Sequence, residues 1–251
     1  MIDRGPEVRF EHVAKSYGVP VVEDVACTIA AGSLVALVGG SGAGKSTLLR
    51  MVNRLVEPES GRVLIDGRDV AEGSAPLLRR RIGYVFQSVG LMPHMRVAEN
   101  IALVPRIAGR PAPDVAALLE MVELSPDYAA RMPSALSGGE QQRVGVARAL
   151  ATGARLMLLD EPFGALDPVT RDAIGRRYRA LHDRLGLTSL MVTHDMAEAL
   201  LLADRILVMA RGRIVGDATP AGMLAGEAGP EAAALVAVPA RQAEAIEALR
   251  G

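Results

Sequence analysis

A glycine-rich run that ends in a lysine and two hydroxyl residues has the composition and spacing of a loop that binds phosphate. The run consists of Gly39, Gly40, Ser41, Gly42, Ala43, Gly44, Lys45, Ser46 and Thr47. Main-chain N–H groups of such a loop, with the N-terminus of a following helix, surround the phosphates of a nucleotide. Lys45 would reach the β- and γ-phosphate oxygens, and the Ser46 hydroxyl would ligate Mg²⁺. The run predicts a site for ATP with Mg²⁺, and the alternative is a plain glycine-rich turn.

Two adjacent carboxylates, Asp160 and Glu161, follow the apolar run 156–159. Charged side chains at the end of a buried strand cost free energy unless they take part in binding or catalysis. Asp160 is expected to hold the Mg²⁺ shell, and Glu161 to orient or deprotonate a water that attacks the γ-phosphate. The alternative is that both residues are solubilising charges at a strand end.

A histidine, His194, follows the apolar run 189–192 and precedes a helical pattern at 195–203. A single histidine is usually structural. In open α/β sheets, however, ligands bind at the carboxyl ends of the strands. The position of His194 therefore favours a contact with the γ-phosphate.

A capping box is expected at the start of the helix that runs through Leu150, because Glu140 follows Ser137 by three residues. The box does not explain the glycine pair, Gly138 and Gly139, that lies between them. Glycines at a helix N-terminus leave N–H groups open to an anion, so the same helix end is also a candidate phosphate contact.

Short apolar runs alternate with helical patterns along most of the chain, which indicates an α/β fold with a mainly parallel sheet covered on both faces. Residues 6–30 lack helical patterns and predict a small antiparallel sheet. Between about 94 and 153 strand patterns vanish, and helical windows at 114–124 and 140–151, interrupted by prolines, predict a helical insertion. The phosphate loop predicts a helix from Lys45 to about Leu55, and the Ala-rich tail one from about Pro239 to Leu249.

Composition argues against several classes of protein. The net charge is −1, without the basic excess that nucleic-acid binding usually requires. Apolar runs fall short of the ~18 residues needed to span a bilayer, and no basic leader indicates secretion. The single cysteine, Cys27, is expected to be a buried small hydrophobe in a reducing compartment.

In this order and spacing, the four elements resemble the nucleotide-binding domain of the ATP-binding cassette (ABC) superfamily, with Ser137 to Gln141 at its signature sequence. The resemblance implies an α/β fold with a P-loop NTPase (RecA-like) core, an N-terminal antiparallel β subdomain and an inserted helical subdomain. It implies a nucleotide-binding domain over residues 1–220, with the insertion at about 90–153. The remainder, 221–251, is an Ala-rich tail that is partly helical.

By the same resemblance, Tyr17 stacks on adenine, although a packed strand-end tyrosine is the alternative. Gln87 lies on the loop that joins Mg²⁺ to the transport subunit, and Asp167 lies on the loop between paired ATP sites. Ser137, Gly138 and Gly139 meet the γ-phosphate held by a second copy. Each chain then carries half of each active site, and catalysis falls to Lys45, Glu161 and His194.

The stretches 51–58, 82–95, 102–105 and 161–171 resemble the importer subgroup for glycine betaine, choline and related quaternary amines. This implies a homodimer under two membrane permease subunits that dock near Gln87–Asn100, an extracytoplasmic substrate-binding protein, and a place at the cytoplasmic face of the inner membrane. Glu140 departs from the subgroup, where Gln is common, and the chain ends at Gly251 without the regulatory modules of some members. The alternatives are an importer for an amino acid or another small solute, an export ATPase with a separate membrane partner, and a soluble ABC ATPase outside transport.

Overall fold

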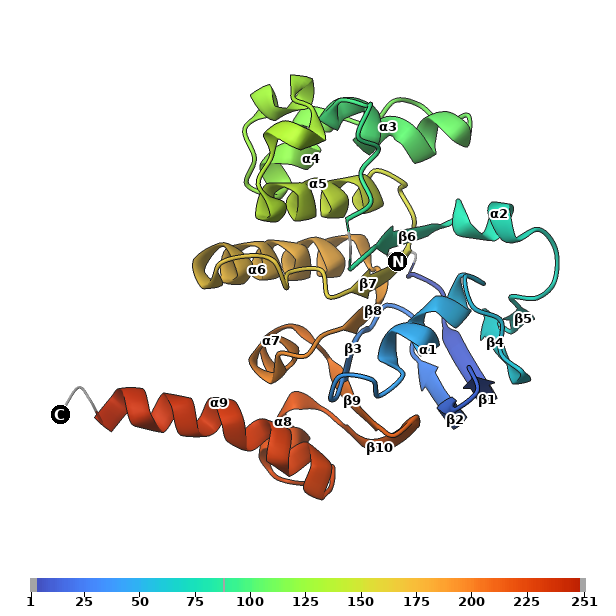
Figure 1. Cartoon of the computed structure of the whole chain (residues 1–251), viewed down its shortest axis with the longest axis vertical. Coiled ribbons are helices and arrows are strands. Elements are labelled where there is room, and N and C mark those ends of the chain that lie inside the picture. Colours follow the sequence, from blue (N-terminus) through green and yellow to red (C-terminus); the bar gives the residue numbers. More distant parts are fainter. Residues whose placement is uncertain (1–3, 88, 249–251) are drawn as a thin grey trace.

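A computed structural model describes residues 4–87 and 89–248 of the chain (Figure 1). Its main sheet has the strand order β10-β9-β3-β8-β7-β6. The strands are β3 (Leu34–Val38), β6 (Ile82–Val85), β7 (Leu156–Asp160), β8 (Thr188–Val192), β9 (Arg205–Ala210) and β10 (Arg213–Ala218). Neighbours pair in parallel from β6 to β9, and only β10 is antiparallel. The predicted α/β fold with a mainly parallel sheet is confirmed.

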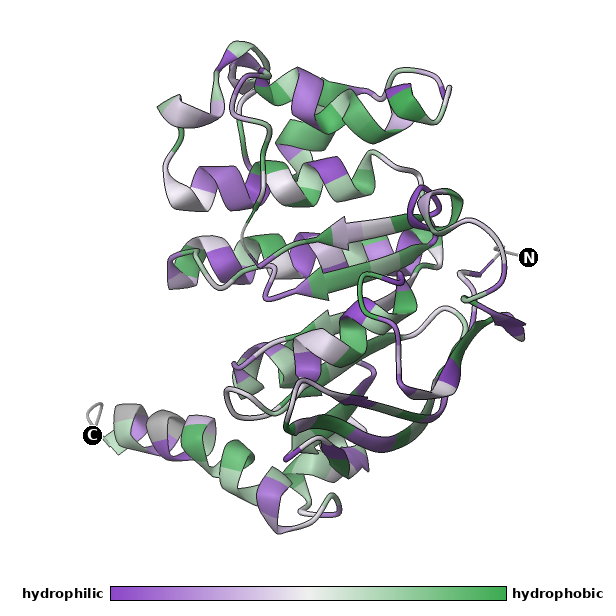
Figure 2. Cartoon of the chain, turned by 45° about the vertical axis from the view of Figure 1, so that its right-hand side comes forward, coloured by the Kyte–Doolittle hydropathy of each residue, from purple (hydrophilic) through white to green (hydrophobic). Residues whose placement is uncertain are grey.

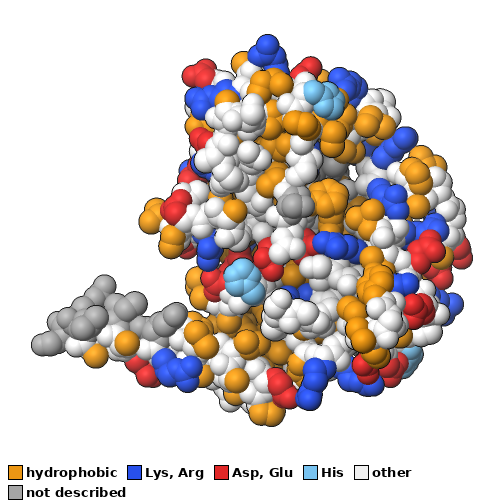
Figure 3. Space-filling model, in the orientation of Figure 1, with side chains coloured by type: hydrophobic (Ala, Val, Ile, Leu, Met, Phe, Trp, Pro, Cys, Tyr) orange, Lys and Arg blue, Asp and Glu red, His pale blue; other side chains and the backbone are white. Residues whose placement is uncertain are grey.

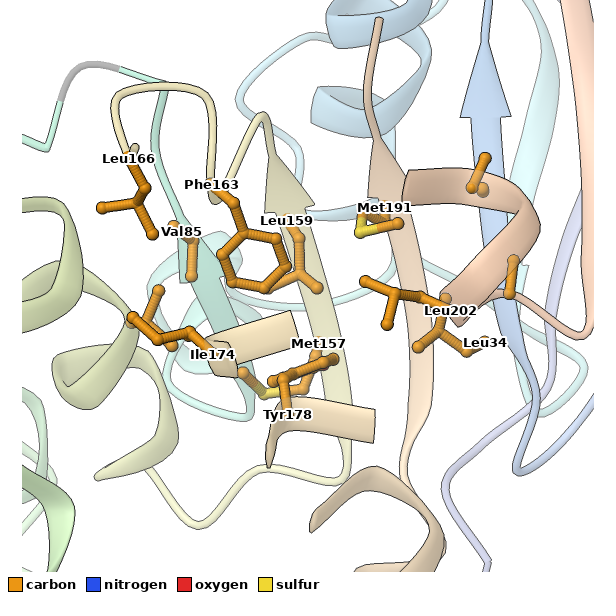
Figure 4. Close-up of a cluster of buried hydrophobic side chains, with 14 of the residues drawn as sticks. Leu34, Val85, Met157, Leu159, Phe163, Leu166, Ile174, Tyr178, Met191 and Leu202 are labelled. Atoms are coloured by element: carbon orange, nitrogen blue, oxygen red, sulfur yellow. The ribbon is translucent and has the colours of Figure 1, made fainter. Parts of the chain in front are cut away.

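Both faces of this sheet are covered, because successive residues of a strand point to opposite sides. In β3, Leu34, Ala36 and Val38 join one hydrophobic cluster, whereas Val35 and Leu37 join the other. Figure 4 shows the first cluster, in which helix α6 (Pro168–Leu185) packs on β7. Figure 2 shows that the strands of this sheet are mostly apolar and that its helices carry both apolar and polar residues. This double burial explains why the strands are continuously apolar.

A second, antiparallel sheet has the strand order β2-β1-β4-β5. The strands are β1 (Val8–Ser16), β2 (Pro20–Ile29), β4 (Ser60–Ile65) and β5 (Arg68–Asp69). Apolar residues of β1, β2 and β4 share a cluster with helix α1 (Lys45–Val52) and with one face of the main sheet. The antiparallel sheet predicted for residues 6–30 therefore exists, but it also contains β4 and β5 from beyond that segment. It supports the helix that follows the phosphate loop.

The helices α3, α4 and α5 lie between β6 and β7 in the chain and form a separate layer at the top of Figure 1. They are α3 (Val97–Ile107), α4 (Val115–Met121) and α5 (Gly138–Leu150), with 3₁₀ turns at Pro126–Ala130 and Pro133–Ala135. Sequence patterns did not predict α3, because Pro105 looked like a helix breaker. Pro105 is buried inside α3, where it lacks only the bond that its own N–H would donate to the carbonyl of Ile101.

Helix ends differ from the prediction in two places. α1 stops at Val52 rather than near Leu55, because Arg54 takes a positive φ of 56° and the N–H of Leu55 turns back to the carbonyl of Arg50. The last helix, α9 (Pro230–Ala248), begins earlier than predicted and contains Pro239. Its predicted end at Leu249 lies outside the described residues.

The C-terminal segment is attached to the core at its start. Short helices α2 (Ala75–Arg79), α7 (Met196–Leu202) and α8 (Pro220–Leu224) complete the fold. Met223 of α8 and Ala232 and Val236 of α9 are buried in the same cluster as β3, while the C-terminal half of α9 projects from the body (Figure 1). Figure 3 shows that acidic and basic side chains are interspersed on this face of the molecule. Within residues 4–87 and 89–248, no helix is both long enough and apolar enough to cross a membrane. Cys27 is half-buried rather than fully buried, and burial raises the pKa of its thiol to about 12.

Candidate functional site

The strand order brings the predicted site residues to one edge of the main sheet. β3 lies beside β8, and β8 lies beside β7. Parallel strands end on the same side, so the phosphate loop after β3, Asp160 and Glu161 at the end of β7, and His194 after β8 meet there. The phosphate loop, Glu161 and His194 line a cleft of about 530 Å³, and the buried Asp160 is bonded to Ser46 of the loop. The lining of the cleft consists of Val21, Ser41, Gly42, Ala43, Gly44, Lys45, Ser46, Thr47, Gln87, Glu161 and His194.

The phosphate loop needs its glycines for space as well as for conformation. Gly39 has φ 151° and Gly44 has φ 99°. A Cβ atom at Gly39 would lie 2.1 Å from the carbonyl oxygen of Met209, and one at Gly44 would lie 2.2 Å from that of Val21. Only glycine fits at both positions, which keeps the loop tight against β2 and β9.

Lys45 is directed into the phosphate loop. Its ammonium group donates to the carbonyl oxygens of Gly39 and Gly40, both at 2.8 Å. Burial lowers its pKa, and the nearby carboxylates of Glu161 and Asp160 act in the opposite direction. A phosphate oxygen in the loop would offer this ammonium group a charged acceptor, which binds more strongly than a carbonyl.

Asp160 and Ser46 form the candidate metal site. Asp160 is fully buried, and one of its oxygens accepts a hydrogen bond of 2.7 Å from the Ser46 hydroxyl. Mg²⁺ is bound by oxygen donors of this kind, so the residues present fit the ion. The second Asp160 oxygen lies 3.2 Å from a guanidinium nitrogen of Arg50 and 3.4 Å from the hydroxyl of Tyr84.

Arg50 and Tyr84 were missed by the sequence reasoning. Arg50 could have been found, because it follows Ser46 by four residues and therefore lies on the same face of α1. Tyr84 gave no such signal. Its contact with Asp160 depends on the pairing of β6 with β7, which no local pattern reveals.

Glu161 contacts two other predicted site residues. One of its carboxylate oxygens lies 3.4 Å from the side-chain nitrogen of Gln87 and 3.4 Å from Nδ1 of His194. Its own N–H donates to the carbonyl of Val192 at 2.9 Å. Glu161 also has a φ of 50°, which is uncommon for a residue with a side chain. The carboxylate is thus held at the mouth of the cleft beside the histidine.

The helix end at Ser137 forms the predicted capping box. The Ser137 hydroxyl accepts from the N–H of Glu140 at 3.3 Å, and a Glu140 carboxylate oxygen accepts from the N–H of Ser137 at 2.7 Å. The Tyr128 hydroxyl also donates to Glu140, and this bond, with the Ser137 contacts, lowers the pKa of Glu140 to about 2. A Cβ atom at Gly138 would meet no atom within 4 Å, so this helix end is open.

This helix end is not brought to the cleft of its own chain, whose lining residues come from other elements. It lies instead beside the loop that carries Asp167, because a Cβ atom at Gly139 would be 3.4 Å from the carbonyl oxygen of Ala165. The Asp167 carboxylate caps α6 by accepting from the N–H groups of Val169 and Thr170. Ser137, Gly138, Gly139 and Asp167 therefore belong to a second group, separate from the cleft.

Tyr17 lies in the turn between β1 and β2, and Val21 of β2 lines the cleft. The Tyr17 side chain is exposed, with a relative accessibility of 59%. The ammonium group of Lys15 lies 5.4 Å from the centre of its ring. The ring is therefore an exposed apolar surface and not a packed core tyrosine.

The fold and the cleft define the class as a P-loop NTPase. Residues 22–164 match the ABC transporter family. The glycine betaine/carnitine/choline transport ATP-binding protein OpuCA of Bacillus subtilis is 46% identical over 219 residues, which cover 85% of this chain and 58% of that protein. The Fe(3+) ions import ATP-binding protein FbpC 2 of Rhodococcus jostii is 48% identical over 211 residues, which cover 83% of this chain and 61% of that protein.

A solved structure agrees in fold. The dimeric, ADP- and Pi-bound, post-hydrolysis state of the ATP-binding cassette MJ0796 superposes with a TM-score of 0.79 at 32% identity, over 85% of this chain and 98% of that one. The chain belongs to the ABC transporter family. It spans less than two thirds of the length of the two relatives named above.

Proposed function

We propose that this chain is the ATP-hydrolysing subunit of an ABC importer. The observation that carries the proposal is the convergence of the phosphate loop, Glu161 and His194 on one cleft, with the buried Asp160 carboxylate bonded to Ser46 of that loop. Lys45 and the loop N–H groups would bind the β- and γ-phosphates. Glu161 would accept a proton from the attacking water, and His194 would contact the γ-phosphate.

Mg²⁺, when bound, neutralises charge on the phosphates. The residues that would hold it are Ser46, Asp160 and Gln87. Gln87 is included because its side-chain amide already lies at the cleft, within 3.4 Å of Glu161. Arg50 and Tyr84 would keep the buried Asp160 carboxylate oriented toward Ser46.

The active form would be a homodimer with two shared ATP sites. Two features of the single chain support this: the open helix end at Ser137 and Gly138 lies outside its own cleft, and it adjoins the loop that carries Asp167. A second copy could bring Ser137, Gly138 and Gly139 to the γ-phosphate, with their N–H groups directed at the anion. The solved relative with bound ADP and Pi is a dimer.

A groove beside Gln87 would receive the membrane permease. It has a volume of about 430 Å³, and Phe86, Met92 and Leu55 are exposed hydrophobic residues in its lining. An apolar groove of this kind suits a short amphipathic helix of a partner. Ser88, which belongs to the predicted docking segment Gln87–Asn100, lies outside the described residues. Docking there would place the chain at the cytoplasmic face of the inner membrane.

The transported solute would be a quaternary amine such as glycine betaine or choline, delivered by an extracytoplasmic substrate-binding protein. The name of the Bacillus subtilis relative supports this solute, and the iron-import relative supports the alternative of another importer. A nucleic-acid-directed function is disfavoured by the net charge of −1 and by the mixture of acidic and basic side chains on the face shown in Figure 3.

Glu161→Gln tests the proposal. The variant keeps the shape of the side chain but cannot accept a proton, so we expect ATP binding with a rate of hydrolysis lower by about 10²-fold or more. An ATP-bound dimer should then accumulate in size-exclusion chromatography.

Glu123→Gln is the matched control. Glu123 is also a glutamate with positive φ, at 56°, but it pairs with Arg177 on the surface. It should keep the wild-type rate. Near-normal hydrolysis by Glu161→Gln would refute the role of Glu161. The solute is tested by uptake of labelled glycine betaine into cells that make the chain with its permease. Cells with the wild-type chain should take it up, and cells with Glu161→Gln should not.

A further inference from the structure

The main chain at Glu161 has an unusual conformation that something must hold. Its φ of 50° lies in the left-handed region, which is unfavourable for a residue with a side chain. Its N–H donates to Val192, and its carbonyl oxygen accepts from the N–H of Gly164 at 3.3 Å. Both of these partners lie next to Glu161 in the sheet or in the chain, so they do not connect it to another layer of the fold.

A buried glutamine from another element makes that connection. The side-chain nitrogen of Gln142 donates to the carbonyl oxygen of Pro162 at 2.9 Å and to that of Glu161 at 3.3 Å. Gln142 has a relative accessibility of 2%. The two protons of one amide are therefore used on two successive carbonyls of the segment that carries Glu161, in a place where water does not compete.

Gln142 belongs to α5, the helix whose N-terminus carries the capping box at Ser137. Ser137, Gly138 and Gly139 are open to an anion, and about one and a half turns along the same helix Gln142 donates hydrogen bonds to the Glu161 segment. The helix end proposed to reach the partner's ATP is thus rigidly joined to the residue proposed to act on water at the chain's own ATP.

We infer that Gln142 is a positioning residue for hydrolysis: it holds the Glu161–Pro162 segment in place and links it to the helix end at Ser137. The inference rests on the role proposed for Glu161. Without the two hydrogen bonds, the Glu161 main chain is free to relax toward ordinary φ values, and the carboxylate moves away from His194. A small displacement of a reacting group is enough to lower kcat strongly, while ATP binding, which depends on the phosphate loop, is spared.

Gln142→Met tests the inference, because methionine has a similar size and shape but no N–H donors. We expect kcat for ATP hydrolysis to fall by about tenfold or more, with KM for ATP changed by less than about threefold. The matched control is Arg143→Met. Arg143 is the next residue on α5 and also donates to a carbonyl oxygen, that of Glu123 at 2.8 Å, but it points to the helical layer. It should keep kcat within about twofold.

A double-mutant cycle separates positioning from general loss of structure. If Gln142 acts through Glu161, then adding Gln142→Met to Glu161→Gln should lower the residual rate no further. A further fall equal to that in the wild-type background would overturn the inference. So would an unchanged kcat in Gln142→Met, or an equal fall in Arg143→Met.

Should Gln142→Met fail to fold, Gln142→Asn serves in its place. It keeps the buried amide but shortens the side chain by one methylene, so both carbonyls are left without their donor. The same fall in kcat with a preserved KM is expected, and a wild-type kcat contradicts the inference. If the wild-type chain hydrolyses ATP and Glu161→Gln does not, an active Gln142 variant refutes only the positioning role. An inactive wild-type chain refutes the proposed function itself.

Discussion

Tyr17 offers a test that separates recognition of the adenine base from recognition of phosphate. Its ring is exposed, at 59%, and the Lys15 ammonium group lies 5.4 Å from the ring centre. Lys15 is also paired with Glu59 at 3.4 Å, so the lysine keeps a partner when the ring is removed. Tyr17→Ala should therefore change the free energy of unfolding by only about 0.5 kcal/mol or less.

The effect on ATP binding should be larger. Stacking of the ring on a purine is worth about 1 kcal/mol, which corresponds to an increase of about fivefold in Kd for Tyr17→Ala. Inorganic tripolyphosphate occupies a phosphate loop without a base, so its affinity should not change. Tyr17→Phe keeps the ring and should bind ATP like the wild-type chain.

Isothermal titration of both ligands into the wild type and the two variants measures these differences. Thermal unfolding without ligand checks that the variants are folded. The stacking role is refuted if Tyr17→Ala binds ATP as tightly as the wild type. It is also refuted if ATP and tripolyphosphate are weakened equally, since the lost interaction would then involve the phosphates.

Two further perturbations address the shared site and the turn after His194. Ser137→Arg removes the cap of α5, which should lower the free energy of unfolding by about 1 kcal/mol. It should abolish ATP hydrolysis in a coupled phosphate assay while nucleotide binding persists. A variant that is monomeric and still hydrolyses ATP would contradict the shared site. Burial raises the pKa of Glu198 from 4.5 to about 7, so its contribution to stability is full below 4.5 and is lost as pH rises through about 7. Urea unfolding at about pH 5 and about pH 8 measures the free energy of unfolding at each pH. Its decrease from pH 5 to pH 8 should be smaller in Glu198→Gln than in the wild type, and an equal decrease would argue against a raised pKa of Glu198.

The local patterns predicted the elements that obey local rules. The apolar runs at 34–38 and 156–159 became the buried strands β3 and β7, because a strand covered on both faces needs apolar residues throughout. The Ser137–Glu140 capping box formed as predicted, since it needs residues only three apart. α3 was missed because Pro105 was weighed as a local breaker, whereas burial of the helix face decided the outcome.

In the candidate site, too, local patterns predicted some features and the packing of the fold decided others. Residue types and spacing alone singled out the phosphate loop, Asp160, Glu161 and His194, because phosphate binding and proton transfer allow few chemical solutions. Only the tertiary structure decided which strands are neighbours, and therefore that these groups meet at one edge of the sheet.

The contacts of Tyr84 with Asp160 and of Gln142 with Glu161 likewise join residues far apart in the chain. Their partners are set by strand pairing and helix packing, which depend on the burial of the whole core rather than on any local pattern. The sequence by itself therefore determined which chemistry is available, and the packing of the fold decided which side chains support it.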